Sequence, residues 1–313
     1  MRKTSGFSFT GPVRSPLAPL DEAAVWLNSP PLTAQSLRGR TVLVDFWTYS
    51  CVNWLRTLPY VRAWAQRYRE QGLVVIGAHA PEFGFEHDLD NVRWAIAELE
   101  VEYPVVIDND FAVWRAFDNH YWPAIYLVDG DGRVRFHHFG EEAYAETERA
   151  VQQLLGVDDD LARVDADGLA AAADWAALKS PETYVGNARG ERRTEREPTE
   201  LALNQWTLTG RWTIEEESAV LDGAGSIAYR FEGRDLNLVL AMAGDTGAAP
   251  FTVLLDGEPP GTDSGIDVDE SGAGTVTAPR MYQLVRQHGS IRPRTFEMQF
   301  PDGGVRAYVF TFG

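Results

Sequence analysis

The hydrophobic pattern of this chain changes about halfway along its length. Between about residues 41 and 156, short apolar runs alternate with segments of helical periodicity, which is typical of an α/β domain built around a central sheet. From about residue 204 onward, nearly every segment alternates apolar and polar residues and is bounded by glycine, proline or aspartate. Many short strands without intervening helices are typical of a β-sandwich or jelly roll. A chain of 313 residues is long enough for both domains.

The first half contains four predicted strands and three predicted helices. The last two strands are separated by Asp129-Gly130-Asp131-Gly132, a strong hairpin turn. Between the first two strands, apolar residues recur at helical spacing, and we expect Pro59 to bend that helix because proline removes a backbone donor. The predicted strands are 41–47, 73–78, 124–128 and 133–139, and the helices are 88–99, 141–155 and the one that carries the stripe Trp54, Leu58, Val61, Ala65 and Tyr68.

The second half contains six clear strands, preceded by a connector. An alanine-rich stretch ending near Leu178 is predicted to be helical, and a charge-dense loop follows it at 189–198. We therefore divide the chain into an N-terminal extension (1–35), an α/β domain (36–157), a helical connector with its loop (158–200) and a β-sandwich domain (201–313). The predicted strands of the last domain are 226–231, 235–242, 251–255, 281–285, 295–300 and 305–312.

The charge of the chain excludes several classes of partner. With 28 Lys and Arg against 46 Asp and Glu, the formal net charge is -18, which repels nucleic acid and anionic membrane surfaces. The first ten residues include no apolar run of signal-peptide length, and no stretch approaches the roughly 20 apolar residues of a membrane span. The chain has one cysteine and therefore no internal disulfide, which fits a reducing compartment, so we expect a cytoplasmic location.

That single cysteine, Cys51, follows a buried strand and begins a predicted helix. Backbone N–H groups at a helix start, together with the helix dipole, favour the thiolate, which is the nucleophilic form of the side chain. The alternative is that Cys51 is a small, inert, buried residue, as most free cysteines are. No set of histidines around Cys51 has the spacing of a metal site, and we predict neither metal nor cofactor.

The residues around Cys51 resemble those of a known family. The run Phe46-Trp47-Thr48-Tyr49-Ser50-Cys51, Pro59, and the pair Trp122-Pro123 before a later strand are similar to the redoxin families of thioredoxin-like proteins. The whole chain resembles the C-terminal part of DipZ-type proteins. This resemblance implies a thioredoxin-like α/β domain followed by a β jelly roll described as carbohydrate-binding-like. Members of that family can be membrane-attached or extracytoplasmic.

One departure from the family pattern limits the mechanism. The residue three after the first cysteine is usually a second cysteine, but here it is Trp54, so a mixed disulfide on Cys51 must be resolved by an external thiol. The leading hypothesis is a single-cysteine thiol oxidoreductase acting on a protein or a low-molecular-weight thiol or disulfide. The alternatives are a redox-inactive binding or adaptor protein and, as a minor possibility, a one-cysteine thiol peroxidase.

The resemblance also implies roles for the neighbouring residues. Asp45 would be a buried acid that handles the proton of the thiol, with the raised pKa of a desolvated carboxylate, and Pro123 would be a cis proline beside the sulfur. A structural aspartate and a trans proline are the competing interpretations. The predicted substrate groove comprises Trp47, Tyr49, Trp54, His79, Glu82 and Trp122, where His79 is equally well explained as a hydrogen-bonded surface residue and Trp54 as core.

The second domain shows no catalytic constellation. Four aromatic residues offer surfaces for stacking on a sugar, although such residues more often form the core of a sandwich. We expect a binding or docking module whose ligand is a carbohydrate or a protein. The four aromatic residues are Trp206, Trp212, Tyr229 and Tyr282.

Overall fold

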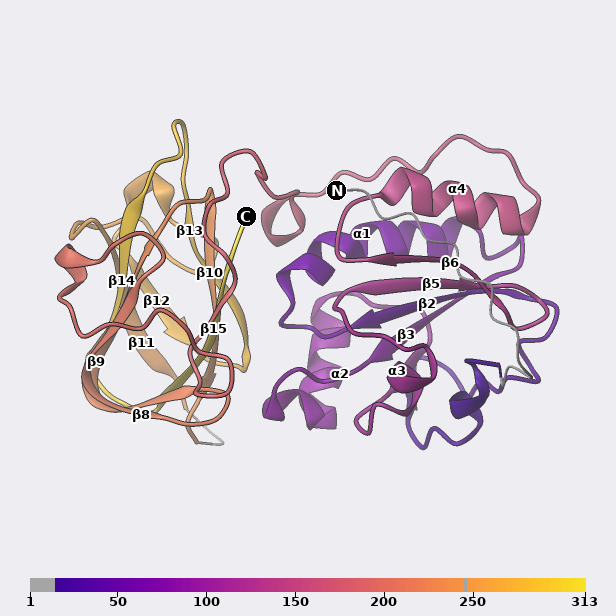
Figure 1. The fold of residues 1–313 in the computed structure, drawn as a ribbon, viewed down its shortest axis with the longest axis horizontal. Helices are drawn as coiled ribbons and strands as arrows, with labels where there is room; N and C mark the ends of the chain where they lie inside the picture. Colours follow the sequence, from indigo (N-terminus) through magenta and orange to yellow (C-terminus); the bar gives the residue numbers. More distant parts are fainter. Residues whose placement is uncertain (1–14, 245–246) are drawn as a thin grey trace. The chain divides into compact units, whose positions relative to one another are not determined.

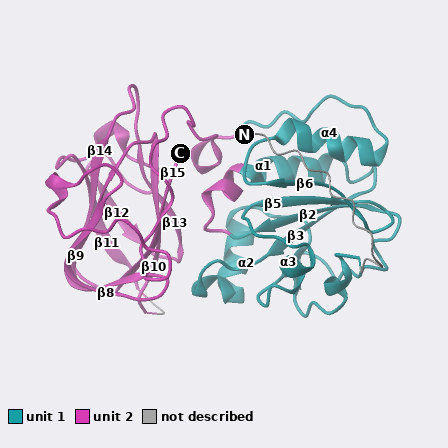
Figure 2. Ribbon diagram, viewed as in Figure 1, with its two compact units in different colours: residues 1–48, 57–165 teal, residues 49–56, 166–313 magenta. Residues whose placement is uncertain are grey.

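The computed structural model describes residues 15–244 and 247–313, and its chain divides into two compact units. The first unit contains the chain up to Thr48 and then Thr57–Asp165, and the second contains Tyr49–Arg56 and Ala166–Gly313 (Figure 2). None of the helices in the described ranges combines the length and the apolar character needed to cross a membrane.

The first unit is built on a six-stranded mixed sheet with the strand order β1-β4-β3-β2-β5-β6 (Figure 1). The central strands β2, β3 and β4 are parallel, whereas β1, β5 and β6 run antiparallel to their neighbours. Every residue of β2 and β5 is buried, which explains their predominantly apolar sequences, interrupted inside β2 by Asp45. The strands are β1 (Trp26–Leu27), β2 (Thr41–Trp47), β3 (Leu73–His79), β4 (Val105–Ile107), β5 (Ala124–Val128) and β6 (Val134–Phe139).

Helices cover both faces of this sheet, with α1 and α4 on one side and α3 on the other (Figure 1). The helices are α1 (Val52–Arg67), α2 (Leu89–Glu98), α3 (Ala112–Ala116) and α4 (Tyr144–Leu155), with short 3-10 turns at Ala18–Asp21 and Gly84–His87. The predicted strands and helices of this half are confirmed to within a few residues. Two strands and one helix of this half were not predicted: β1, which comes from the N-terminal extension, its partner β4, and the short helix α3.

The hairpin predicted at Asp129-Gly130-Asp131-Gly132 joins β5 to β6, with Gly132 donating a backbone hydrogen bond to Asp129. A Cβ atom at Gly130 would lie 2.9 Å from Cα of Gly39, so this turn requires glycine. Pro59 lies inside α1, which nevertheless continues to Arg67.

The helix predicted in the alanine-rich connector is wrong. Between residues 158 and 182 the structure has only one 3-10 turn, Gly168–Ala170. Gly168 takes a left-handed φ of +53°, and the alanines provide no apolar stripe for packing. An isolated helix of this length is marginal in water without such packing, which explains the extended chain.

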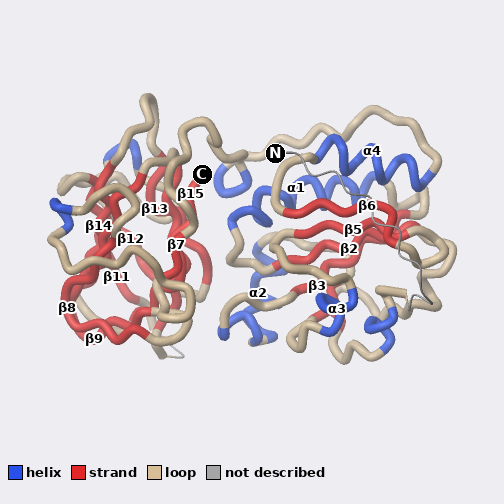
Figure 3. The backbone as a smooth tube through the Cα atoms, in the orientation of Figure 1, coloured by secondary structure: helices blue, strands red, loops and turns tan. Residues whose placement is uncertain are grey.

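The second unit is an all-β structure, as predicted, in which antiparallel strands form one large curled sheet (Figure 3). The main path runs β12-β11-β14-β9-β15-β10-β13, with β7 paired to β15 and β8 paired to β9. Its inner face holds a core rich in phenylalanine and leucine. The strands are β7 (Thr183–Tyr184), β8 (Trp206–Ile214), β9 (Ala219–Phe231), β10 (Asp235–Met242), β11 (Ala249–Leu255), β12 (Ala273–Val276), β13 (Arg280–Arg286), β14 (Arg294–Phe300) and β15 (Val305–Phe312).

Candidate active site

One edge of the first unit's sheet gathers most of the predicted site residues. Because β2 and β3 are parallel and in register, their last residues, Trp47 and His79, are direct neighbours. On the other side of β2, Phe46 pairs with Ala124, so Pro123 lies at the same edge. The chain leaves this edge at Trp47 and reaches Cys51 four residues later.

Cys51 is the residue immediately before the first turn of α1. Its carbonyl oxygen accepts a hydrogen bond from the Leu55 amide at 3.0 Å, which marks Cys51 as the N-cap position. Its side chain is partly exposed. Cys51 therefore combines two features of reactive cysteines, a position at a helix N-terminus and access to solvent.

Two aromatic residues on either side of Cys51 are buried. Trp54, at the position where the family usually has its second cysteine, has no exposed surface, and Tyr49 is 3% exposed. The interpretation of Trp54 as a core residue is therefore confirmed. As these side chains lie in the structure, neither presents an open aromatic face to a substrate.

Asp45 is completely buried in the middle of β2. The Tyr103 hydroxyl donates a hydrogen bond of 3.4 Å to Asp45 Oδ2. Burial and the negative charge of Asp45 raise the pKa of Tyr103 well above its ordinary value, so Tyr103 stays protonated and remains a donor.

The neighbouring strand, β3, leaves room for the side chains of Trp47 and Tyr103 only because it carries a glycine. A Cβ atom on Gly77 would lie 2.7 Å from Nε1 of Trp47 and 3.0 Å from a ring carbon of Tyr103. Gly77 is the direct partner of Asp45 in the β2–β3 register.

His79 is also fully buried, so the surface interpretation of this histidine is wrong. Its ring packs edge-on against Trp47, with 4.9 Å between the ring centroids. Burial, with a smaller contribution from His87, lowers the pKa of His79 to about 3. His79 is therefore neutral across the physiological pH range.

The peptide bond between Trp122 and Pro123 is cis, as the resemblance implied. Trp122 is partly buried, its indole N–H donates to the Ala80 carbonyl at 3.0 Å, and its ring packs on Trp114 at 4.4 Å. Trp122 is thus held in a fixed orientation beside the proline.

Glu82, in the chain that follows β3, is partly exposed.

Asp108, a buried carboxylate that follows β4, was not predicted as a site residue from the sequence. Its two oxygens accept hydrogen bonds from the backbone amides of Val113 (2.9 Å) and Trp114 (2.8 Å) at the start of α3. Burial raises the pKa of Asp108 to about 6, even though these hydrogen bonds act in the opposite direction. An aspartate directly after a strand and a few residues before a short helix was the available signal for a capping role.

Within residues 15–244 and 247–313, no group of three or more His, Cys, Asp or Glu side chains is arranged to hold a metal ion.

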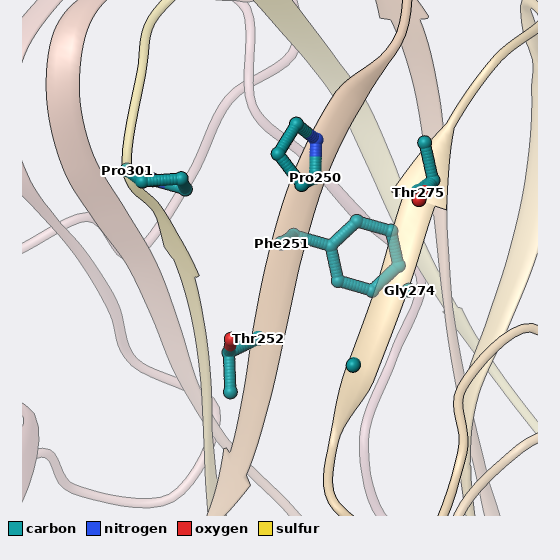
Figure 4. A pocket seen from close by; sticks show the side chains of 7 residues that line it. Pro250, Phe251, Thr252, Gly274, Thr275 and Pro301 are labelled. Carbon is teal, nitrogen blue, oxygen red and sulfur yellow. The ribbon is translucent and has the colours of Figure 1, made fainter.

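The second unit contains a shallow cavity of about 390 Å³ between β11 and β12 (Figure 4). The ring of Phe251 lies against Gly274, where a Cβ atom would be 2.3 Å from the ring. No charged side chain lines this cavity, and it contains none of the predicted site residues. Its lining consists of Pro250, Phe251, Thr252, Ala273, Gly274, Thr275 and Pro301.

The aromatic residues considered for sugar stacking mostly belong to the core of the second unit. Trp206, Tyr229 and Tyr282 are buried, and only Trp212 is partly exposed. The interpretation of these three residues as sandwich core is confirmed, and they offer no open platform for a sugar.

Comparison with known proteins finds two family models that match this chain, one in each half. Residues 18–155 match the family model described as Redoxin, and residues 180–313 match the model described as Thioredoxin like C-terminal domain. The chain is 34% identical over 305 residues to Protein DipZ of Mycobacterium tuberculosis (strain CDC 1551 / Oshkosh), which covers 92% of this chain and 41% of that protein. This chain therefore spans less than half of the length of its DipZ relatives.

Two shorter proteins are each similar to part of this chain. Thiol-disulfide oxidoreductase YkuV of Bacillus subtilis (strain 168) is 29% identical over 143 residues, which covers 46% of this chain and 96% of YkuV. A thioredoxin-like protein whose solution structure was solved in the oxidised form is 29% identical, with 47% of this chain and 98% of that chain covered and a TM-score of 0.41.

Proposed function

Because the chain is a homologue of the DipZ-type proteins, with a redoxin domain followed by a thioredoxin-like C-terminal domain, we propose that it is a thiol–disulfide oxidoreductase with Cys51 as its only nucleophile. The observation that carries the proposal is the position of Cys51, partly exposed at the N-cap of α1. Its substrate is a disulfide-bonded molecule, and an external thiol completes the cycle.

The proposed cycle has two exchange steps. The Cys51 thiolate attacks one sulfur of a substrate disulfide, which forms a mixed disulfide with that sulfur and releases the other as a thiolate that takes up a proton. An external thiolate then attacks the mixed disulfide, forms a new disulfide with the substrate sulfur and returns Cys51 as a thiolate. No second cysteine in the chain can perform this second step, because Cys51 is the only one.

We assign the proton-handling role in this cycle to Asp45. Asp45 lies on the strand that leads to Cys51 and accepts a hydrogen bond from Tyr103. His79 is the other titratable residue at the carboxyl ends of β2 and β3, but with a pKa of about 3 it is a very weak base at neutral pH. Pro123 and Trp122 form the wall of the proposed substrate groove, where the fixed indole of Trp122 limits rearrangement.

The test is to incubate the reduced protein with glutathione disulfide and measure the intact mass. We expect one glutathione adduct, absent in a Cys51→Ser variant and removed by dithiothreitol. The rate of Cys51 alkylation measured against pH should have its midpoint below the roughly 8.5 of a free thiol, because the helix N-terminus favours the thiolate. A protein that gains no adduct, or a midpoint at or above that of a free thiol, would contradict the proposal.

The buried Trp54 favours one other function. Because a fully buried indole replaces the usual second cysteine, the chain also suits a redox-inactive binding protein. That function predicts a correctly folded protein whose thiol resists both glutathione disulfide and alkylation. The same mass measurement therefore separates the two.

A further inference from the structure

The first unit carries an exposed aromatic surface next to Pro123. We call it the Tyr121 surface, and it consists of Tyr121, His137 and Phe139. Tyr121 is 53% exposed and Phe139 is 40% exposed, and His137 is also exposed. The ring centroids are 4.9 Å apart for Tyr121 and Phe139 and 4.8 Å apart for His137 and Phe139. Large apolar side chains that are exposed together in this way are typical of interaction sites.

Buried residues beneath the Tyr121 surface hold its rings in place. The buried ring of Tyr126 lies 5.9 Å from those of both His137 and Phe139, and its hydroxyl donates to Asn119 Oδ1 at 3.3 Å. Asn119, itself buried, donates from Nδ2 to the Tyr121 carbonyl at 3.0 Å. The rings are therefore preorganised, which lowers the entropic cost of binding.

The same residues border a free strand edge. Among the described residues, β6 is the outermost strand of its sheet and pairs with β5 alone (Figure 1). The Gly140 amide donates to the Pro123 carbonyl at 2.8 Å, and this bond sets the alternation along the antiparallel pair. By that alternation the backbone groups of His137 and Phe139 point away from β5, toward the open edge, where an extended chain can add as a further strand.

The charge of β6 differs from that of the chain as a whole. Residues 132–140 include two arginines and two histidines and no acidic residue, in a protein of net charge -18. The arginines are paired with the hairpin carboxylates, Arg133 with Asp131 at 3.3 Å and Arg135 with Asp129 at 3.5 Å. The strip therefore lacks the excess negative charge of the chain as a whole, so an acidic chain is repelled less here than elsewhere on the molecule.

We propose that the Tyr121 surface and the β6 edge bind an extended polypeptide that carries an aromatic side chain with an acidic neighbour. The aromatic side chain packs on Tyr121 and Phe139, and the acidic one lies toward His137 and Arg135. This inference rests on the proposed function and narrows its substrate to polypeptide disulfides, because Tyr121 is two residues before Pro123 and β6 ends beside it.

The test has two independent measurements. The first is the affinity of the full chain for two fluorescent 12-residue peptides without cysteine, identical except for a central Phe-Asp or Ser-Lys pair, measured by anisotropy. The second is the rate at which Cys51 displaces thionitrobenzoate from the same peptides carrying an activated cysteine. Glutathione disulfide serves as the small substrate.

We expect the Phe-Asp peptide to bind and react about tenfold better, since an aromatic contact of this kind contributes about 0.5–1.5 kcal/mol per pair. The double variant Tyr121→Ser with Phe139→Thr should lose this preference and keep its rate with glutathione disulfide. Trp175, 49% exposed in the second unit, provides the control, and Trp175→Ser should behave as the wild type.

The two proposals fail in different ways. Equal affinity for the two peptides, or an unchanged preference in the double variant, would overturn the docking surface whatever Cys51 does. An inert Cys51 in a protein that still binds the Phe-Asp peptide through Tyr121 and Phe139 would overturn the oxidoreductase and retain the surface.

Discussion

Replacing Glu148 with alanine should strongly destabilise the first unit. Glu148 lies on α4, is 2% exposed, and accepts three hydrogen bonds from different parts of the chain. The donors are Nε1 of Trp64 at 3.0 Å, the hydroxyl of Tyr68 at 2.6 Å and the amide of Ala162 at 2.8 Å. Glu148 thus connects α1, α4 and the segment that follows α4.

The size of the stability loss follows from the hydrogen bond that each donor loses in the alanine variant. A hydrogen bond to a charged group contributes about 1.5–3 kcal/mol, and a buried donor left unsatisfied costs about 1–3 kcal/mol. Trp64 and Tyr68 are completely buried and both would lose their acceptor, because the hydrogen bond from Gln152 at 2.7 Å is accepted by the Tyr68 hydroxyl and leaves its O–H unpaired, whereas the partly buried amide of Ala162 can reach water. We therefore expect a loss of about 3–5 kcal/mol, a large part of the stability of a typical domain.

Differential scanning calorimetry of the full chain is the direct assay. A loss of that size should lower the melting temperature of the first unit by roughly 10–15 °C, at about 2–4 °C per kcal/mol for a unit of this length. The second unit should melt as in the wild type. Glu148→Gln, which keeps one carbonyl acceptor, should lose about half as much, and Tyr68→Phe about 1–2 kcal/mol.

An alanine variant within about 1 kcal/mol of the wild type would refute this reasoning, because three hydrogen bonds to a buried carboxylate could not then be stabilising. A Gln variant as unstable as the alanine variant would show instead that the charge of Glu148, rather than its acceptor geometry, provides the stability.

Two pH-dependent predictions of opposite sign concern Asp108 and His79. The pKa of Asp108 is raised to about 6, so its contribution to stability is complete below pH 3.8 and is lost as the pH rises through 6. Between pH 4 and 7 the wild type should lose roughly 1–3 kcal/mol relative to Asp108→Asn, and parallel unfolding curves would contradict this. The pKa of His79 is lowered to about 3, so its contribution is present above pH 6.5 and lost on acidification. From pH 7 to pH 5 the wild type should lose roughly 2 kcal/mol relative to His79→Gln, and an imidazole NMR signal that titrates near pH 6.5 would refute it.

The sequence predicted most strands because their patterns are local. β2 and β5 are buried on both faces, so each appears in the sequence as a predominantly apolar run with clear ends. β1 was missed because two residues carry no periodicity, and its pairing with β4 is a long-range contact. The connector was predicted as a helix because alanine favours helices in isolation, whereas the structure has only the 3-10 turn Gly168–Ala170 there, with none of its residues buried.

For the candidate site, the sequence predicted the sheet edge at which Trp47 and His79 lie, but not how deeply the site residues are buried. Spacing along β2 and β3 correctly placed Trp47 and His79 at one sheet edge, because register in a parallel sheet follows from strand ends. The burial of these side chains could not be predicted, because it depends on residues that are distant in sequence. Tyr103, which hydrogen-bonds Asp45 from 58 residues away, has no local signal that connects it to the site.

The environments of these residues restrict how a proton can move at this sheet edge. His79 does not take up a second ring proton at neutral pH, because its pKa is about 3, and Tyr103 does not release its hydroxyl proton, because burial raises its pKa well above the ordinary value. A group that both takes up and releases a proton must have access to both states near the working pH. Among the side chains that the structure describes around β2 and β3, these two therefore act as fixed elements, one a neutral ring and the other a permanent donor. This supports Asp45 as the proposed proton-handling residue, and Asp45→Asn should slow glutathione adduct formation more than Tyr103→Phe does.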